Sequence, residues 1–217
     1  MLLAAAGGED LDQHYDRLLA AHDYANLAAE LKRGSETQAL VLPTLAWEQR
    51  RVAAGGSIFL GAMYALDLLA AGRDSSDPAA DAKTRENAVV VGLYTIAAIE
   101  TDGTKCADAA APAARRQQFA QILAPVWAEL RKLPDEAVVR DLARALTEER
   151  ALADARPPDD YLCRGRTADI ADALAGGATE QAPRFAGRDA WIPRQVAARS
   201  QLPGALTDFA ARLKSGG

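Results

Sequence analysis

Two cysteines, Cys106 and Cys163, are the residues of this chain best suited to covalent chemistry. They lie in the polar, glycine-containing contexts DGTKCAD and DDYLCRGR, whereas free structural cysteines usually occupy apolar segments. A disulfide between them is therefore predicted, with two unrelated thiols as the alternative. The bridge would close a loop of about 57 residues, for which chain entropy gives on the order of 4 kcal/mol of stabilisation.

Acidic residues gather at the end of the most apolar stretch of the chain. Glu100, Asp102 and Asp108 lie close to Lys105 in the sequence. Paired carboxylates perform acid–base chemistry when burial separates their pKa values, and a solvated helix end is the alternative interpretation. A ligand pocket between helices near Tyr94 and Glu100 is kept as a second hypothesis.

Two tryptophans each lie beside arginines. Trp47 precedes Arg50 and Arg51, and Trp191 precedes Arg194. Tryptophan and arginine are enriched at binding hot spots, so these two groups are the predicted partner-binding residues. The alternative is a half-buried tryptophan that arginine stems cover.

No sequence motif indicates catalysis or cofactor binding. The histidines, His14 and His22, are eight positions apart, which is too far for two ligands of one metal ion on a helix. No phosphate-binding glycine loop and no GxSxG element is present. No catalytic residue, metal site or cofactor is therefore predicted; whether the chain is an enzyme is left open, and a non-enzymatic role is favoured.

The net charge of −5 argues against a general nucleic-acid binder, which would carry a basic face. No uncharged run reaches the roughly 18 residues that span a bilayer, so no transmembrane segment is predicted. The expected partner is another, unidentified protein.

The N-terminal residues bear on the compartment. Leu2 to Gly8 is a short apolar stretch of small residues, followed by acidic Glu9 and Asp10. It looks like the tail of a secretory signal with an Ala-x-Ala cleavage region, and an ordinary frayed terminus is the alternative. Together with the cysteines, it favours a periplasmic or secreted location over a cytoplasmic one.

Helical periodicity extends over most of the chain. Apolar residues at helical spacing predict two helical hairpins, over residues 11–33 and 36–71. Gly34 is expected to end the second helix as a C-cap glycine. Asp77 and Pro78 form a strong helix start, from which one long helix would extend to Asp102. Its second half is apolar all round, which indicates a buried central helix, with a buried strand as the alternative.

The predicted fold class is all-α, an irregular helical bundle or α-solenoid of about eight to ten helices with one long buried central helix. A single helical domain is expected over residues 10–214, with a sub-boundary considered at the proline-containing linker 156–160. Residues 1–9 and 215–217 are expected to be disordered. The C-terminal half is assigned to helices 112–133 (kinked at Pro125), 134–155, 167–175, 191–199 and 203–214, with a loop at 176–189.

The two hairpins resemble the helix-pair repeats of tetratricopeptide and Sel1-like proteins. The resemblance covers at most residues 10–72, and neither Tyr15 nor Trp47 places the remaining small and aromatic residues on the tetratricopeptide pattern. The N-terminal stretch, the two cysteines and the alanine and arginine bias are also similar to uncharacterised helical envelope proteins of GC-rich bacteria. These resemblances imply a fold and a compartment and carry no functional residue across.

The leading hypothesis is a non-enzymatic protein-interaction or scaffold protein of the bacterial envelope, because helix-pair surfaces bind peptides in their concave grooves. One alternative is a helical enzyme or small-ligand-binding protein with a pocket between helices. The other is a subunit of a larger complex, in which neighbours would cover the Trp47 and Trp191 regions.

Overall fold

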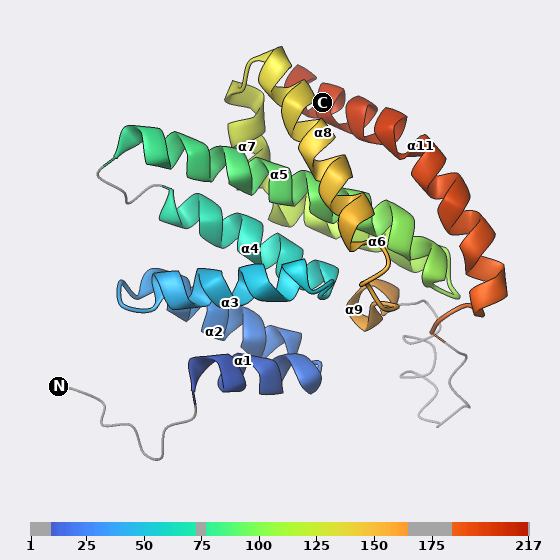
Figure 1. Ribbon diagram of the computed structural model, residues 1–217, viewed down its shortest axis with the longest axis horizontal. Helices are drawn as coiled ribbons and strands as arrows, with labels where there is room; N and C mark the ends of the chain where they lie inside the picture. Colours follow the sequence, from blue (N-terminus) through green and yellow to red (C-terminus); the bar gives the residue numbers. More distant parts are fainter. Residues whose placement is uncertain (1–9, 73–76, 165–183, 217) are drawn as a thin grey trace.

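The computed structural model describes residues 10–72, 77–164 and 184–216, and it confirms the all-α class (Figure 1). These residues form ten α-helices and one 3-10 turn. The elements are α1 (Leu11–Ala20), α2 (Tyr24–Glu36), α3 (Val41–Ala53), α4 (Ile58–Ala71), α5 (Pro78–Asp102), η1 (Gly103–Lys105), α6 (Ala110–Ile122), α7 (Ala124–Lys132), α8 (Asp135–Leu152), α9 (Asp160–Cys163) and α11 (Arg188–Ser215).

Helix α5 is the central helix, as predicted, and it crosses the middle of the molecule in Figure 1. The Asp77 carboxylate caps it, accepting hydrogen bonds from the amides of Ala79 at 2.9 Å and Ala80 at 3.3 Å. From Ala88 to Ile99 it is buried almost throughout, because α4, α6, α7, α8 and α11 all pack against it. The buried-strand alternative for this stretch is therefore wrong.

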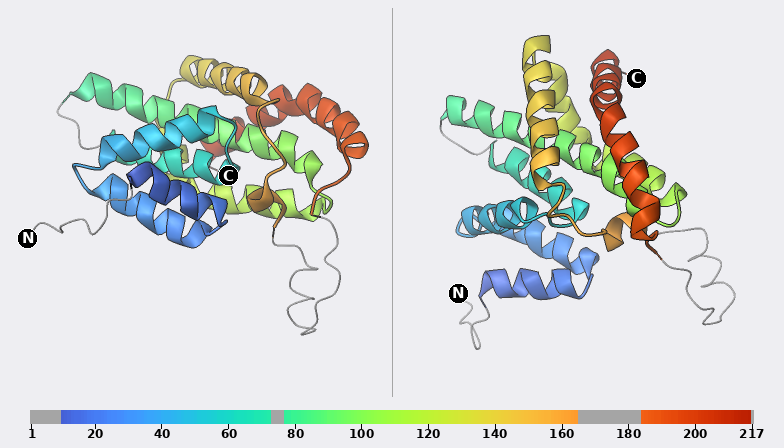
Figure 2. Two further views of the ribbon diagram at one scale, coloured as in Figure 1. Left: turned by 60° about the horizontal axis from the view of Figure 1, so that its bottom comes forward. Right: turned by 45° about the vertical axis from the view of Figure 1, so that its right-hand side comes forward.

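The core has two parts that meet along α4. The larger part surrounds α5, and the smaller one lies between α1, α2, α3 and α4, which Figures 1 and 2 show as successive helices on one side of α5. Val52, Met63 and Tyr161 contact both parts. The N-terminal helices therefore pack onto the rest of the fold through shared side chains.

Gly34 does not end α2, which continues to Glu36. A Cβ atom at this position would lie 2.3 Å from Oγ1 of Thr44 and 2.6 Å from the hydroxyl oxygen of Tyr15. Glycine is required here because α1 and α3 both approach α2 closely, and the prediction of a C-cap was wrong.

The prolines have different effects from those predicted. The expected kinked helix 112–133 is two helices, α6 and α7, because Pro125 lies in the first turn of α7. The two expected closing helices are one, α11, which contains Pro193 and Pro203 and follows an arc in Figure 1. It extends through Ser215, the first residue of the segment expected to be disordered. The predictions for residues 1–9, for 167–175 and for most of 176–189 lie outside the described residues.

The linker 156–160 is anchored to the core by two buried residues, Arg156 and Asp159, whereas Pro157 and Pro158 are exposed. Asp159 is buried and accepts hydrogen bonds from the Ser57 hydroxyl at 2.9 Å and the Ile58 amide at 2.7 Å, at the start of α4. The same carboxylate accepts from the Tyr161 amide at 2.9 Å and so caps α9. One buried side chain thus joins two helix N-termini that are about a hundred residues apart in the chain.

Gly61 on α4 faces α5, and a Cβ atom there would lie 2.5 Å from Oγ1 of Thr95. We expect Gly61→Ala to lower the free energy of unfolding by about 1–3 kcal/mol, because the closely packed helices must separate. Gly204→Ala is the matched control, since nothing lies within 4 Å of that position on α11; it should stabilise by up to about 1 kcal/mol. Urea denaturation measures both, and equal effects would contradict the close approach of α4 and α5.

Candidate functional site

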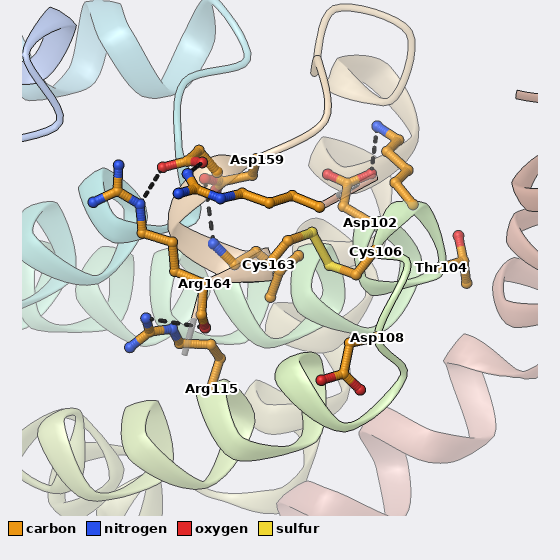
Figure 3. The surroundings of a disulfide bond; sticks show 12 residues. Asp102, Thr104, Cys106, Asp108, Arg115, Asp159, Cys163 and Arg164 are labelled. Atoms are coloured by element: carbon orange, nitrogen blue, oxygen red, sulfur yellow. Dashed lines mark hydrogen bonds and ion pairs between the residues drawn. A yellow bond between two sulfur atoms is a disulfide. The ribbon is translucent and has the colours of Figure 1, made fainter. Parts of the chain in front are cut away.

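The predicted disulfide between Cys106 and Cys163 is confirmed (Figure 3). Both residues are buried, with Cα atoms 5.3 Å apart, and the bridge joins the end of η1 to α9. Nearby, Nε of Arg115 donates to the carbonyl oxygen of Tyr161 at 2.9 Å, and its guanidinium lies 4.3 Å from the centroid of that ring. The bridge therefore holds the segment after α8 against α5 and α6.

A buried ion network lies beside the disulfide. Arg156 pairs with Asp102 and with Glu149, the latter at 2.6 Å between Nη2 and Oε1. Lys105 pairs with the other oxygen of Asp102 at 2.9 Å and donates to the backbone carbonyl of Arg156 at 2.8 Å. Gln195 on α11 also donates to Asp102, at 3.2 Å. All five side chains are less than 10% exposed, so the network joins α5, η1, α8 and α11 within the core.

The charges in this network compensate one another. Burial alone would lower the pKa of Arg156, but the carboxylates of Asp102 and Glu149 raise it above its usual value, so the guanidinium stays charged. Removing one partner from such a set leaves the others buried without a counter-charge, which costs far more than the set contributes. The network is therefore a structural element that joins four parts of the chain, although Oε2 of Glu149 has no hydrogen-bond partner among the described residues.

The other acidic residues of this region do not form an acid–base pair. Glu100 pairs on the surface with Arg116 at 2.7 Å, and Asp108, two residues before α6, accepts a hydrogen bond from the Ala110 amide at 2.8 Å. Glu100 and Tyr94 line different cavities, so no single pocket contains the two predicted residues. Burial raises the pKa of Tyr94, whose ring lies 5.8 Å from the Arg156 guanidinium. Tyr94 thus packs against the ion network.

Trp47 belongs to the core and offers no surface to a partner. Its side chain is fully buried, its Nε1 donates to Asp16 at 2.9 Å, and its ring meets that of Tyr15 with centroids 5.0 Å apart. Arg50 and Arg51 lie further along α3 and form ion pairs with acidic residues of α1. The two arginines that were predicted to bind a partner protein therefore pair with α1 within the chain.

Trp191 and Arg194 lie near the start of α11. Trp191 is half-buried, and the ammonium of Lys105 lies 5.5 Å from its ring centroid. Arg194 is exposed and donates to the carbonyl oxygen of Ala190 at 3.1 Å. Trp191 thus covers one end of the ion network, and a partner-binding role for these two residues stays a prediction.

The histidines are ordinary surface residues. His14 lies 3.9 Å from Glu30, and His22 lies 3.2 Å from both Asp160 and the hydroxyl of Tyr24. Among the described residues, no group of three or more metal-binding side chains gathers around a common point. Within the same residues, no helix combines the length and the apolar character needed to cross a bilayer.

A groove that the sequence did not indicate lies between α2, α3 and α4. Its volume is about 970 Å³, and its lining is largely apolar. We call it the α2–α4 groove; its lining residues are Ala28, Lys32, Ser35, Glu36, Gln38, Val41, Leu42, Met63, Leu66, Asp67, Ala70 and Ala71. Leu42, which is 77% exposed, stands at its edge. The groove is therefore a largely apolar depression with two carboxylates in its lining, the exposed Glu36 of α2 and Asp67 of α4.

A second carboxyl group stands behind Asp67. Glu48 on α3 is 0% exposed, and neither of its oxygens meets a hydrogen-bond donor among the described residues, nor does Oδ2 of Asp67. Burial and the charge of Asp67 both raise the pKa of Glu48, which disfavours ionisation of the two carboxyls at once. A buried acid pair of this kind cannot be doubly ionised without a large cost.

Glu48 is the protonated carboxyl of the pair. Burial raises its pKa well above the usual range, and the charge of Asp67 raises it further. Burial also raises the pKa of Asp67 to about 6, and the charge of Glu36 adds to this shift, whereas the polar groups of Ser35 and Glu48 oppose it. At neutral pH, Glu48 is therefore a neutral donor and Asp67 a carboxylate beside the groove.

The sequence contained a signal for this pair. Thr44, Trp47 and Glu48 occupy helical positions i, i+3 and i+4, and all three are fully buried, so Glu48 lies on the core-facing stripe of α3. Asp67 is the one charged residue within α4. A buried carboxyl pair is indicated when an apolar helix contains one carboxylate and a neighbouring helix has an acidic residue on its buried face.

Comparison with protein-family models, with curated proteins and with solved structures finds no match to this chain.

Loss of the disulfide should destabilise the fold. We expect the double variant Cys106→Ala, Cys163→Ala to lose about 2–4 kcal/mol of unfolding free energy, because its unfolded chain is no longer crosslinked. The measurement is urea denaturation of the variant and of the wild type, each with and without dithiothreitol. The reductant should shift the midpoint of the wild type alone once the bridge is reduced; equal midpoints for the oxidised wild type and the double variant would show that the bridge contributes nothing.

The raised pKa of Asp67 predicts a pH-dependent penalty. Its folded pKa of about 6 exceeds the unfolded value of about 3.9, so the native state binds more protons between these values and stability falls as pH rises through them. Relative to Asp67→Asn, the wild type should lose about 2 kcal/mol between pH 4 and pH 7, with no further change above.

Thermal and urea unfolding from pH 4 to pH 8 measures this difference. Glu36→Gln is the matched control, because Glu36 is exposed on the same groove and should differ from the wild type by less than about 0.5 kcal/mol. A constant gap between wild type and Asp67→Asn over the whole range would contradict the burial of an ionised Asp67.

Proposed function

We propose that this chain is a non-enzymatic protein-interaction protein of the bacterial envelope, and that it binds an apolar helical segment of a partner protein in the α2–α4 groove. The observation that carries the proposal is the groove itself, an open apolar depression of about 970 Å³ between three helices. An amphipathic helix binds such a groove by inserting side chains spaced at i, i+3, i+4 and i+7.

The groove exposes apolar side chains, which are more favourable in contact with a partner than with water. Leu42 is the most exposed of the large apolar residues in the described part of the chain. Met63 and Leu66, on α4, add flexible apolar surface beside it, and methionine adapts well to different binding partners. Exposed apolar patches of this kind commonly mark interaction sites.

The disulfide supports the proposed compartment. Such bridges form and persist where the surroundings are oxidising, as in the bacterial periplasm, and they are rare in the reducing cytosol. Because Cys106 and Cys163 are both buried, the bridge is also protected from exchange with external thiols.

A small-molecule ligand is the second candidate for the same groove. The volume of about 970 Å³ lies within the range of small-molecule sites, roughly 300–1,000 Å³. The open form of the groove favours the peptide, because small-molecule sites enclose most of their ligand's surface.

A selection from a phage-displayed peptide library on the purified disulfide-bonded protein tests the proposal. Peptides enriched on the wild type should carry apolar residues at helical spacing, and they should bind Leu42→Asp at least about tenfold more weakly, since a charge would enter the apolar edge. Val139→Asp is the matched control, because Val139 is 67% exposed and lies on α8, outside the groove; its affinity should stay within about twofold of the wild type.

Thermal unfolding establishes beforehand that both variants are folded. No enrichment over an unrelated protein, or equal binding to wild type and Leu42→Asp, would overturn the proposed docking surface. Enrichment of peptides that Val139→Asp loses and Leu42→Asp retains would move the interaction to α8 and overturn it as well.

A further inference from the structure

We propose that the α2–α4 groove selects partners by one basic residue, a lysine whose ammonium group binds the Asp67 carboxylate while Glu48 holds a proton behind it. This inference rests on the proposed function, because it names the chemistry of the segment that occupies the groove.

The geometry at Asp67 calls for a cation. Its Oδ2 atom is buried and has no hydrogen-bond donor among the described residues. The neighbouring lining, formed by Met63, Leu66 and Ala70 on the same helix, supplies no donor either. An ionised carboxylate in such surroundings is costly, and a partner's ammonium in the groove would supply the missing counter-charge.

The chain's own cations near the groove have other partners. Lys32 at the edge pairs with Glu36 at 3.8 Å, and both side chains are largely exposed. Arg50 and Arg51 on α3 pair with carboxylates of α1. Among the described residues, no ion pair to Asp67 or Glu48 is formed, so the carboxylate is left for an external cation.

Glu36 is charged, and its charge adds to the raised pKa of Asp67. The remaining groups that face the pair are neutral. Burial, and then the charge of Glu48, raises the pKa of Tyr64 on α4; burial likewise raises that of Tyr15 on α1, with a smaller contribution from Glu48. The Ser35 hydroxyl of α2 faces Asp67. These groups keep their protons throughout the acid and neutral range, so Asp67 is the group whose charge changes near pH 6.

Lysine fits this site better than arginine. One oxygen of Asp67, Oδ2, is buried, so the carboxylate does not offer two parallel oxygens to the groove. A compact ammonium needs one such acceptor, whereas the planar guanidinium is suited to two parallel oxygens. The four-carbon stem of lysine would also lie along the apolar lining.

Binding of the ammonium competes with protonation of Asp67. Below pH 6 the carboxyl is increasingly protonated and attracts a cation weakly; above pH 6 it is ionised and binds fully. Affinity for the basic ligand should therefore rise with pH between about 5 and 7.5, while the lysine itself, with a pKa near 10.4, stays charged throughout.

An NMR titration with n-hexylammonium and 1-hexanol tests the inference, because these probes imitate a lysine stem with and without its charge. At pH 7.5, hexylammonium should bind at least about tenfold more tightly than hexanol and shift resonances of groove residues. This advantage should disappear at pH 5 and in Asp67→Asn, which should still bind hexanol as the wild type does.

Two further variants separate charge from structure. Glu136→Gln removes an exposed carboxylate at the start of α8, outside the groove, and should change the affinity for hexylammonium by less than about twofold. Glu48→Gln replaces the protonated acid by a neutral donor and should retain the preference for hexylammonium. Loss of that preference in either variant would overturn the assignment to Asp67.

Equal affinity for hexylammonium and hexanol in the wild type would also overturn the lysine site, as would an affinity for hexylammonium that does not change between pH 5 and pH 7.5. Neither result bears on the proposed function, which the peptide selection tests. Selected peptides that depend on Leu42 but carry no basic residue would support the docking surface and contradict its specificity for lysine.

Discussion

The burial of Arg156 is the constraint on which the arrangement of the C-terminal half depends. Its guanidinium is compensated only when the end of α5 supplies Asp102 and α8 supplies Glu149. Lys105 balances the second oxygen of Asp102 and binds the carbonyl oxygen of Arg156 itself. A charge set of this kind is stable only when every member is in place, since a single unpaired charge in the core costs several kcal/mol. The covalent bridge from Cys106 to Cys163 holds the same segments together.

The features that could be predicted from the sequence are those that neighbouring residues in the chain indicate. Ser57, and Asp77 with Pro78, are strong N-terminal signals, and the helices α4 and α5 begin where these residues indicate. The cysteine pair was recognisable because its surroundings were polar. The break between α6 and α7 and the continuity of α11 were not predictable in this way, because the effect of a proline depends on whether its helix is packed on both sides of it.

The burial of charged residues was the main feature that the sequence did not predict. Arg156 stands next to two prolines in a segment that reads as a linker, and Glu48 stands next to exposed arginines. Charged residues are assigned to the surface by default because they are rarely fully buried unless they are paired. Their partners here come from distant parts of the chain, as Asp102 does for Arg156, and sequence patterns do not report such pairings.

The two buried carboxylate sites differ in a way that separates structure from function. Asp102 has two cations and an amide around it, whereas Asp67 has only a hydroxyl and another acid. The first arrangement is complete and needs no ligand. The second is incomplete, because Oδ2 of Asp67 has no hydrogen-bond donor among the described residues, and Asp67 lines an open groove. The contrast between the two sites is the basis for the proposed lysine site.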